Sequence, residues 1–211
     1  MRRMSPVDYL LNEAGRWLSD LHPPPDAVRP YPAQSLPDDK LNRSQRRESA
    51  AFMRVNHAGE IAAQGLYLGQ ALAARSAAVR THMRMAAREE TDHLRWCERR
   101  LGELNSRVSW LTPFWGLGSL AIGLVAGLAG DRRSLGFVEE TERQVGAHLE
   151  SHLARLSEED ARSRAIVGQM KKDEEDHRRQ ATDAGAESVP EPVRFGMAAA
   201  ARVMTRTAYW L

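Results

Sequence analysis

The feature that most constrains the fold of this chain is a pattern of metal-binding residues that occurs twice. Each copy has one glutamate followed, thirty residues later in the first copy and thirty-two in the second, by Glu-x-x-His. The residues are Glu60, Glu90 and His93 in the first copy and Glu142, Glu174 and His177 in the second. Three residues along an α-helix leave two side chains about 60° apart, so the Glu and His of one motif can reach the same ion. One such motif is weak evidence, but two at matched positions predict a metal site.

The duplicated pattern requires four long helices packed together. One glutamate from each of two helices and Glu-x-x-His from each of two others form the ligand set of di-iron and di-manganese bundles. Carboxylates can bridge two ions, and neutral imidazole suits iron. Four carboxylates buried without a matching cation would be very costly, whereas two divalent ions would neutralise them. We therefore expect two bound iron ions, against the alternative that these side chains lie on solvated helix surfaces.

Three glutamates compete for one ligand position, namely Glu139, Glu140 and Glu142. The apolar stripe of this helix runs through Val138, Val145, Leu149 and Leu156. Measured around the helix from Val138, Glu142 lies about 40° away, whereas the other two glutamates lie about 100° and 200° away. The register therefore predicts that Glu142 points into the core.

The composition agrees with an all-α bundle. Hydrophobic residues make up 42% of the chain and aromatic residues only 6%, and runs of β-branched residues are few, which favours helices over strands. We expect the bundle helices over residues 41–75, 77–104, 134–156 and 158–184, and an accessory helix over 193–211. Ser157 is the expected N-cap of the fourth helix, because acidic residues follow it in the first turn.

The segment before this bundle has a different character. Ser5 is a good N-cap, and the apolar residues after it keep a helical spacing as far as Leu21. A run of three prolines ends this short amphipathic helix, and three further prolines are expected to keep the chain extended as a linker. We therefore expect an N-terminal helix and linker over residues 1–38 and the catalytic domain over residues 39–211.

Charge and cysteine content exclude some classes of function. The formal net charge of +2 leaves no broad basic surface, so nucleic-acid binding is not expected. The single Cys97 cannot form an internal disulfide, which suits a reducing compartment, and a small thiol in the core or on the surface is its expected role. Acidic residues interrupt the N-terminal apolar residues, so we expect neither a signal peptide nor a mitochondrial presequence, and we expect a bacterial cytoplasmic origin.

Residues 108–130 form an insert of 23 residues without any charge between the two copies of the pattern. The insert is long enough to be scored as a membrane span, but a simple crossing would separate the two pairs of helices that must share one metal site. Pro113, five glycines and the aromatic residues at one end favour a re-entrant or interfacial segment instead. Monotopic or peripheral membrane attachment is the expectation, and a buried apolar crossover is the alternative.

Four other side chains are candidates for a supporting role near the metal. Tyr67 lies seven residues after Glu60 and shares its helix face, so it could contact a ligand or be an ordinary core residue. Three histidines could form hydrogen bonds to a ligand carboxylate or to the substrate, although each is more often a partly exposed helix residue. They are His57, His148 and His152.

The sequence closely resembles the bacterial branch of the demethoxyubiquinone hydroxylase family. The resembling blocks are RVNHAGE (Arg54 to Glu60), LYLGQ (Leu66 to Gln70), EETDHLRWC (Glu89 to Cys97), Ser134 to Leu153, and DEEDH (Asp173 to His177). They cover most of residues 50–180, and their combination is highly specific. The resemblance implies a ferritin-like fold in which Glu60 and His93 hold one iron, Glu142 and His177 hold the other, and both Glu90 and Glu174 bridge.

The resemblance also implies a reaction. It inserts one oxygen atom from O2 into the demethoxyubiquinol ring during ubiquinone biosynthesis, with NADH as a reductant that is not tightly bound. The apolar insert would serve the isoprenoid tail, which places the enzyme peripherally on the cytoplasmic side of the inner membrane, as a possible homo-oligomer or member of a biosynthetic complex.

The alternatives are a di-iron quinol oxidase and a ferroxidase-type ferritin-like protein. A rubrerythrin-like peroxidase would usually add a four-cysteine site, and a purely structural bundle would need no buried carboxylates.

Overall fold

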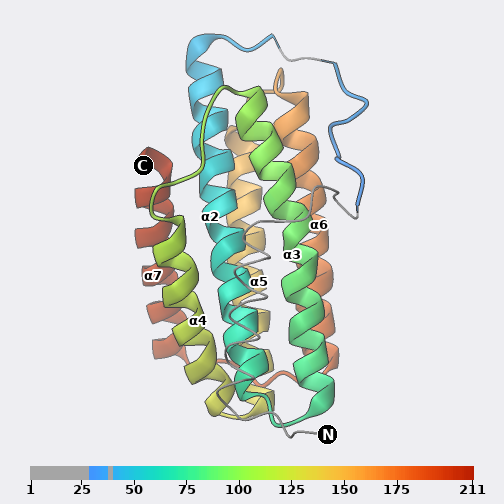
Figure 1. The fold of residues 1–211 in the computed structure, drawn as a ribbon, viewed down its shortest axis with the longest axis vertical. Helices are drawn as coiled ribbons and strands as arrows, with labels where there is room; N and C mark the ends of the chain where they lie inside the picture. Colours follow the sequence, from blue (N-terminus) through green and yellow to red (C-terminus); the bar gives the residue numbers. More distant parts are fainter. Residues whose placement is uncertain (1–28, 38–39) are drawn as a thin grey trace, which may run out of the picture.

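The computed structural model describes residues 29–37 and 40–211, and within these ranges all regular secondary structure is helical. The helices are α2 (Arg43–Ala73), α3 (Ala77–Glu103), α4 (Thr112–Leu128), α5 (Asp131–Arg155), α6 (Ala161–Asp183) and α7 (Glu191–Trp210). Four of them, α2, α3, α5 and α6, form the long bundle in Figure 1, and α4 and α7 pack against α2 from outside. The all-α, ferritin-like prediction is confirmed, whereas the predicted N-terminal helix lies outside the described residues.

Helix α4 explains how the two pairs of bundle helices are joined. The chain turns back once between α2 and α3, and once between α5 and α6 (Figure 1). Between these hairpins, the loop after α3 and then α4 carry the chain back along the bundle, so that α3 and α5 run in the same direction. The two copies of the metal-binding pattern therefore lie on two hairpins that face each other.

The start of α6 differs from the prediction. Ser157 does not cap this helix; Asp160 does, by accepting a hydrogen bond from the backbone N–H of Ser163 at 2.9 Å. The chain between the two positions forms a turn, in which the N–H of Asp160 donates to the carbonyl of Ser157. Asp160 is buried and also accepts from the guanidinium of Arg100 at 2.8 Å. That long-range partner selects the later cap.

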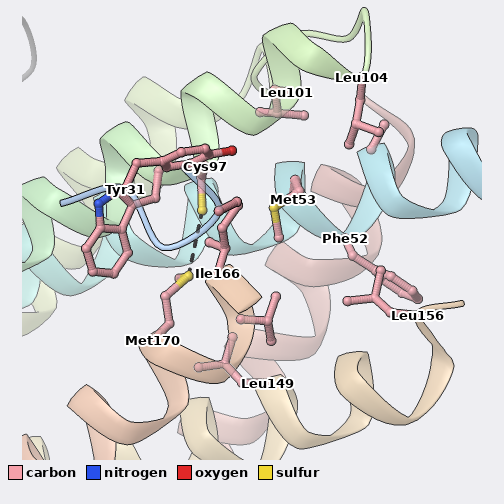
Figure 2. Packing of buried hydrophobic residues seen from close by; sticks show 14 residues of the cluster. Tyr31, Phe52, Met53, Cys97, Leu101, Leu104, Leu149, Leu156, Ile166 and Met170 are labelled. Carbon is pink, nitrogen blue, oxygen red and sulfur yellow. Dashed lines mark hydrogen bonds between the residues drawn. The ribbon is translucent and has the colours of Figure 1, made fainter. Parts of the chain in front are cut away.

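Two apolar clusters fill the bundle, one toward each end. The first gathers residues from the start of α2 and α6 and from the end of α3 and α5 (Figure 2). Its centre includes Cys97, whose thiol donates to the sulfur of Met170 at 3.9 Å, so of the two expected places for this cysteine, core or surface, the structure gives the core. The second cluster, around Tyr67, Met83 and Leu135, takes the opposite ends of the same helices. The predicted metal ligands lie between the two clusters.

Residues 29–37, which we call the strap, pack on this bundle. The prediction of an extended linker was wrong for the strap, because two backbone hydrogen bonds, from Gln34 to Tyr31 and from Leu36 to Ala33, fold it into turns. Tyr31 and Ala33 are buried in the first cluster. Burial of these two side chains fixes the strap against the core. It thereby also positions Arg29, which is the first residue of the strap.

Helix α4 lies very close to α2 because glycines from both helices meet. A Cβ placed on Gly123 would lie 2.1 Å from the carbonyl oxygen of Leu66, and one placed on Gly69 would lie 2.2 Å from that of Leu120. Only glycine permits this approach of the two backbones. Most of the large apolar side chains of the insert consequently face outward, and Trp110 and Phe114 are 74% and 78% exposed. Trp115 is an exception, because it packs partly buried against Val55 and Ala58. The insert is a crossover, as one alternative held, but most of its large apolar side chains are exposed.

Among the helices that the structure describes, none has the length and apolar character that a membrane crossing would need.

Candidate metal centre

The six predicted metal ligands meet in the middle of the bundle, and all six are buried. They form two overlapping groups in which one ligand atom from each residue lies within 4.8 Å of the others. One group is Glu60, Glu90, His93 and Glu174, and the other is Glu90, Glu142, Glu174 and His177. Glu90 and Glu174 belong to both groups, so each carboxylate is placed where it could bridge two ions.

The two histidines face the shared carboxylates in the same way. Nδ1 of His93 lies 2.8 Å from Glu90 and 3.3 Å from Glu174. Nδ1 of His177 lies 3.3 Å from Glu90 and 3.2 Å from Glu174. Each distance joins the imidazole nitrogen to a carboxylate oxygen. The near-equal geometry follows from the duplicated sequence pattern, which puts each Glu-x-x-His on the same face of its own helix.

The chemistry of these side chains fits two divalent cations. Among the described residues, one carboxylate oxygen each of Glu90, Glu142 and Glu174 is buried without a hydrogen-bond partner. Burial raises the pKa of Glu60 and of Glu142 well above the ordinary range, because a charged carboxylate is poorly solvated here. Two divalent ions would supply both the missing partners and the missing positive charge. Carboxylate oxygens combined with imidazole suit iron or manganese.

Two acidic residues that the sequence reasoning missed hold the outer nitrogens of the histidines. Nε2 of His93 lies 2.9 Å from Oδ2 of Asp173, and Nε2 of His177 lies 2.6 Å from Oε2 of Glu89. Such a partner fixes the orientation of a metal-binding imidazole. A signal was available in the sequence, because each acid immediately precedes the Glu of one Glu-x-x-His motif and contacts the histidine of the other.

The choice of Glu142 over its neighbour Glu140 has a geometric basis. Glu142 lies in the second group of ligand atoms, whereas Glu140 turns aside to Arg143 and Gln144. The guanidinium of Arg143 donates to both carboxylate oxygens of Glu140, at 2.7 and 2.8 Å. The side chain that the helix register predicted therefore reaches the cluster.

Within the described residues, none of the four supporting candidates forms a hydrogen bond to any of the six ligands. Tyr67 is buried in the second apolar cluster, and within the described chain its hydroxyl has no hydrogen-bond partner. The rings of His148 and His152 are 4.1 Å apart, and His152 also stacks on Phe52 at 4.4 Å. Burial lowers the pKa of both, that of His152 to about 3, so both are neutral at pH 7. Nε2 of His57 lies 3.3 Å from Glu98. Their roles at the metal stay predictions.

Comparison with known proteins identifies the family. The model of the family described as ubiquinone biosynthesis protein COQ7 matches residues 47–208. A 3-demethoxyubiquinol 3-hydroxylase of Nitrosomonas europaea is 51% identical over 97% of this chain and 99% of its own length. Proteins of the same name from Bordetella parapertussis and Xanthomonas oryzae pv. oryzae are each 53% identical over 100% of this chain, covering 95% and 97% of their own lengths. The resemblance found in the sequence is confirmed: the chain belongs to the ubiquinone biosynthesis protein COQ7 family.

Proposed function

We propose that this protein is a 3-demethoxyubiquinol 3-hydroxylase, a di-iron monooxygenase of ubiquinone biosynthesis. The observation that carries the proposal is the pair of ligand groups sharing Glu90 and Glu174, in a chain whose relatives bear that name. Glu60 and His93 would hold one iron, and Glu142 and His177 the other. Two bound iron ions would supply the redox chemistry that activates O2.

The residues of the site orient the two histidines and keep water away from the metal ions. Burial of all six ligands excludes bulk water from the site. Asp173 and Glu89 hold the outer nitrogens of the two histidines, so that Nδ1 of each imidazole points toward the shared carboxylates. In the reaction a ring C–H becomes C–OH, and the second oxygen atom of O2 leaves as water. Two electrons and two protons complete the balance: in this proposal NADH supplies both electrons and one proton, and the second proton comes from water.

The exposed apolar residues support attachment to a membrane surface, where a substrate with an isoprenoid tail would reside. Apart from Met85 on α3, those more than half exposed lie just before α4, along it and on α7, and they are Trp110, Phe114, Leu117, Val125, Leu128, Phe195, Val203 and Trp210. Apolar patches of this kind are rare on surfaces that meet only water. We place the protein peripherally on the cytoplasmic side of a bacterial inner membrane.

The product of the reaction tests the proposed activity. The iron-loaded protein is reduced without oxygen, then given O2 and a demethoxyubiquinol with a short tail, and the quinones are analysed by mass spectrometry. A product with one added oxygen atom is expected. Consumption of O2 without a hydroxylated quinone would show a quinol oxidase instead. Oxidation of added Fe(II) to an Fe(III) mineral would show a ferroxidase.

Flotation with anionic phospholipid vesicles tests the membrane surface. The Phe114→Ser, Phe195→Ser double variant should float with the vesicles much less than the unmodified protein, because each change removes an exposed aromatic ring. Met85→Ser is the matched control, since Met85 is 55% exposed but lies on α3. Equal flotation of all three proteins would contradict the proposed surface.

A further inference from the structure

The strap makes a contact with the metal site that the proposed function does not use. The guanidinium of Arg29 donates to both carboxylate oxygens of Asp173, from Nη1 to Oδ2 at 2.8 Å and from Nη2 to Oδ1 at 3.0 Å. It also lies over the ring of Trp96, with 4.9 Å between the guanidinium carbon and the ring centre. A bidentate pair of this kind fixes the plane and the position of the carboxylate.

Asp173 is held by more than this one partner. The amide of Gln169, one helical turn earlier, donates to Oδ1 at 2.9 Å, while Oδ2 faces Nε2 of His93 at 2.9 Å. Three different side chains therefore contact one carboxylate, which is largely buried. The position of the His93 imidazole thus depends on a residue 144 positions away in the chain from the aspartate that holds it.

The equivalent acid in the other half of the site is supported differently. The side chain of Glu89 is 46% exposed, and its Oε2 lies 2.6 Å from Nε2 of His177. Within the part of the chain that the structure describes, no hydrogen bond joins Glu89 to a second side chain. The two halves are matched at the metal ligands but not in the side chains that hold those ligands.

We propose that Arg29 is a positioning residue for the metal centre: by fixing Asp173 it fixes His93, so that the ion bound by Glu60 and His93 is held more firmly than the ion bound by Glu142 and His177. The strap is then part of the metal site. Loss of such an outer partner typically costs about 10-fold to 100-fold in metal affinity. The inference rests on the proposed metal centre, but its test can fail separately.

The test is the rate at which Fe(II) leaves the protein. Protein loaded anaerobically with two Fe(II) per chain is mixed with an excess of a coloured Fe(II) chelator, and the absorbance is followed. The unmodified protein should release its iron in two phases of equal amplitude. Arg29→Ala should accelerate the slow phase about tenfold and leave the fast phase unchanged. Arg29→Lys keeps the charge without the bidentate geometry and should fall between the two.

Two further variants separate positioning from a general loosening of the strap. Arg99→Ala is the matched control, because the guanidinium of Arg99 lies over the ring of Tyr31 in the same strap, at 4.2 Å. It should leave both phases unchanged. Asp173→Asn should also accelerate the slow phase, and adding it to Arg29→Ala should give little further change, since both act through His93. Circular dichroism of each variant checks that the bundle is intact.

The outcomes distinguish the two proposals. If the unmodified protein does not bind two Fe(II), the metal centre itself is wrong. If it binds two but releases them in one phase, or if Arg29→Ala matches the unmodified protein, the metal centre stands and the role of Arg29 is wrong. An equal acceleration by Arg99→Ala would also overturn that role.

Discussion

Replacing Gly123 by alanine tests whether the close packing of α4 on α2 is required. The added Cβ would lie 2.1 Å from the carbonyl oxygen of Leu66 and 2.8 Å from its carbonyl carbon. Both atoms belong to the backbone, so no side-chain rotation can relieve the overlap. Moving this contact out to about 3.4 Å requires a shift of the helices by about 1 Å. Forced overpacking of this type costs about 1–3 kcal/mol.

Gly118→Ala is the matched comparison, because Gly118 lies in the same helix and a Cβ there meets nothing within 4 Å. Alanine is favoured over glycine in a helix by about 1 kcal/mol, and this gain applies to both variants. Gly118→Ala should therefore raise the free energy of unfolding, and Gly123→Ala should fall below it by about 1–3 kcal/mol. Urea denaturation followed by circular dichroism measures both values. Equal free energies of unfolding in the two variants would refute the close-packing argument.

Three further predictions concern pH, ligand choice and helix capping. The pKa of His152 is lowered to about 3, so between about pH 6.5 and pH 3 the unfolded chain binds a proton that the folded protein does not. The free energy of unfolding, measured by urea denaturation, should therefore fall as the pH is lowered through this range. His152→Phe should reduce the change in this free energy by up to about 1.4 kcal/mol per pH unit. Glu142→Gln should lose about one bound iron per chain by elemental analysis, whereas Glu140→Gln should keep both. Asp160→Ala should lower the free energy of unfolding by about 3 kcal/mol or more, because a helix cap and a buried ion pair are lost together. Ser157→Ala should change this free energy by less than about 0.5 kcal/mol.

The parts of the site that were predicted from sequence are those that a single helix encodes. Glu90 with His93, and Glu174 with His177, are three residues apart on one face, and the apolar register selected Glu142 from three candidates. The position of α6 was harder to predict, because Ser157 is a good local cap and only the folded protein brings Arg100 to Asp160. A preference set by a distant partner overrides the local signal.

Longer-range features show the same limit. The contact between Arg29 and Asp173 spans 144 residues and depends on how the strap folds, so no spacing rule could reveal it. The pairing of Asp173 with His93 could have been suspected from the duplicated acid before each motif, but not its support by the strap. The charge-free insert was recognised as special, yet the outward direction of its large side chains follows from the glycine contacts between α2 and α4.

The iron content of variants at the shared carboxylates tests the central claim most directly. The unmodified protein should hold two iron ions per chain, measured by elemental analysis after loading and desalting. Glu90 and Glu174 each belong to both groups of ligand atoms, so Glu90→Ala and Glu174→Ala should each lose more iron than a variant of a ligand to one ion, such as Glu60→Ala. Full iron loading of Glu90→Ala and Glu174→Ala would contradict a centre built on two bridging carboxylates.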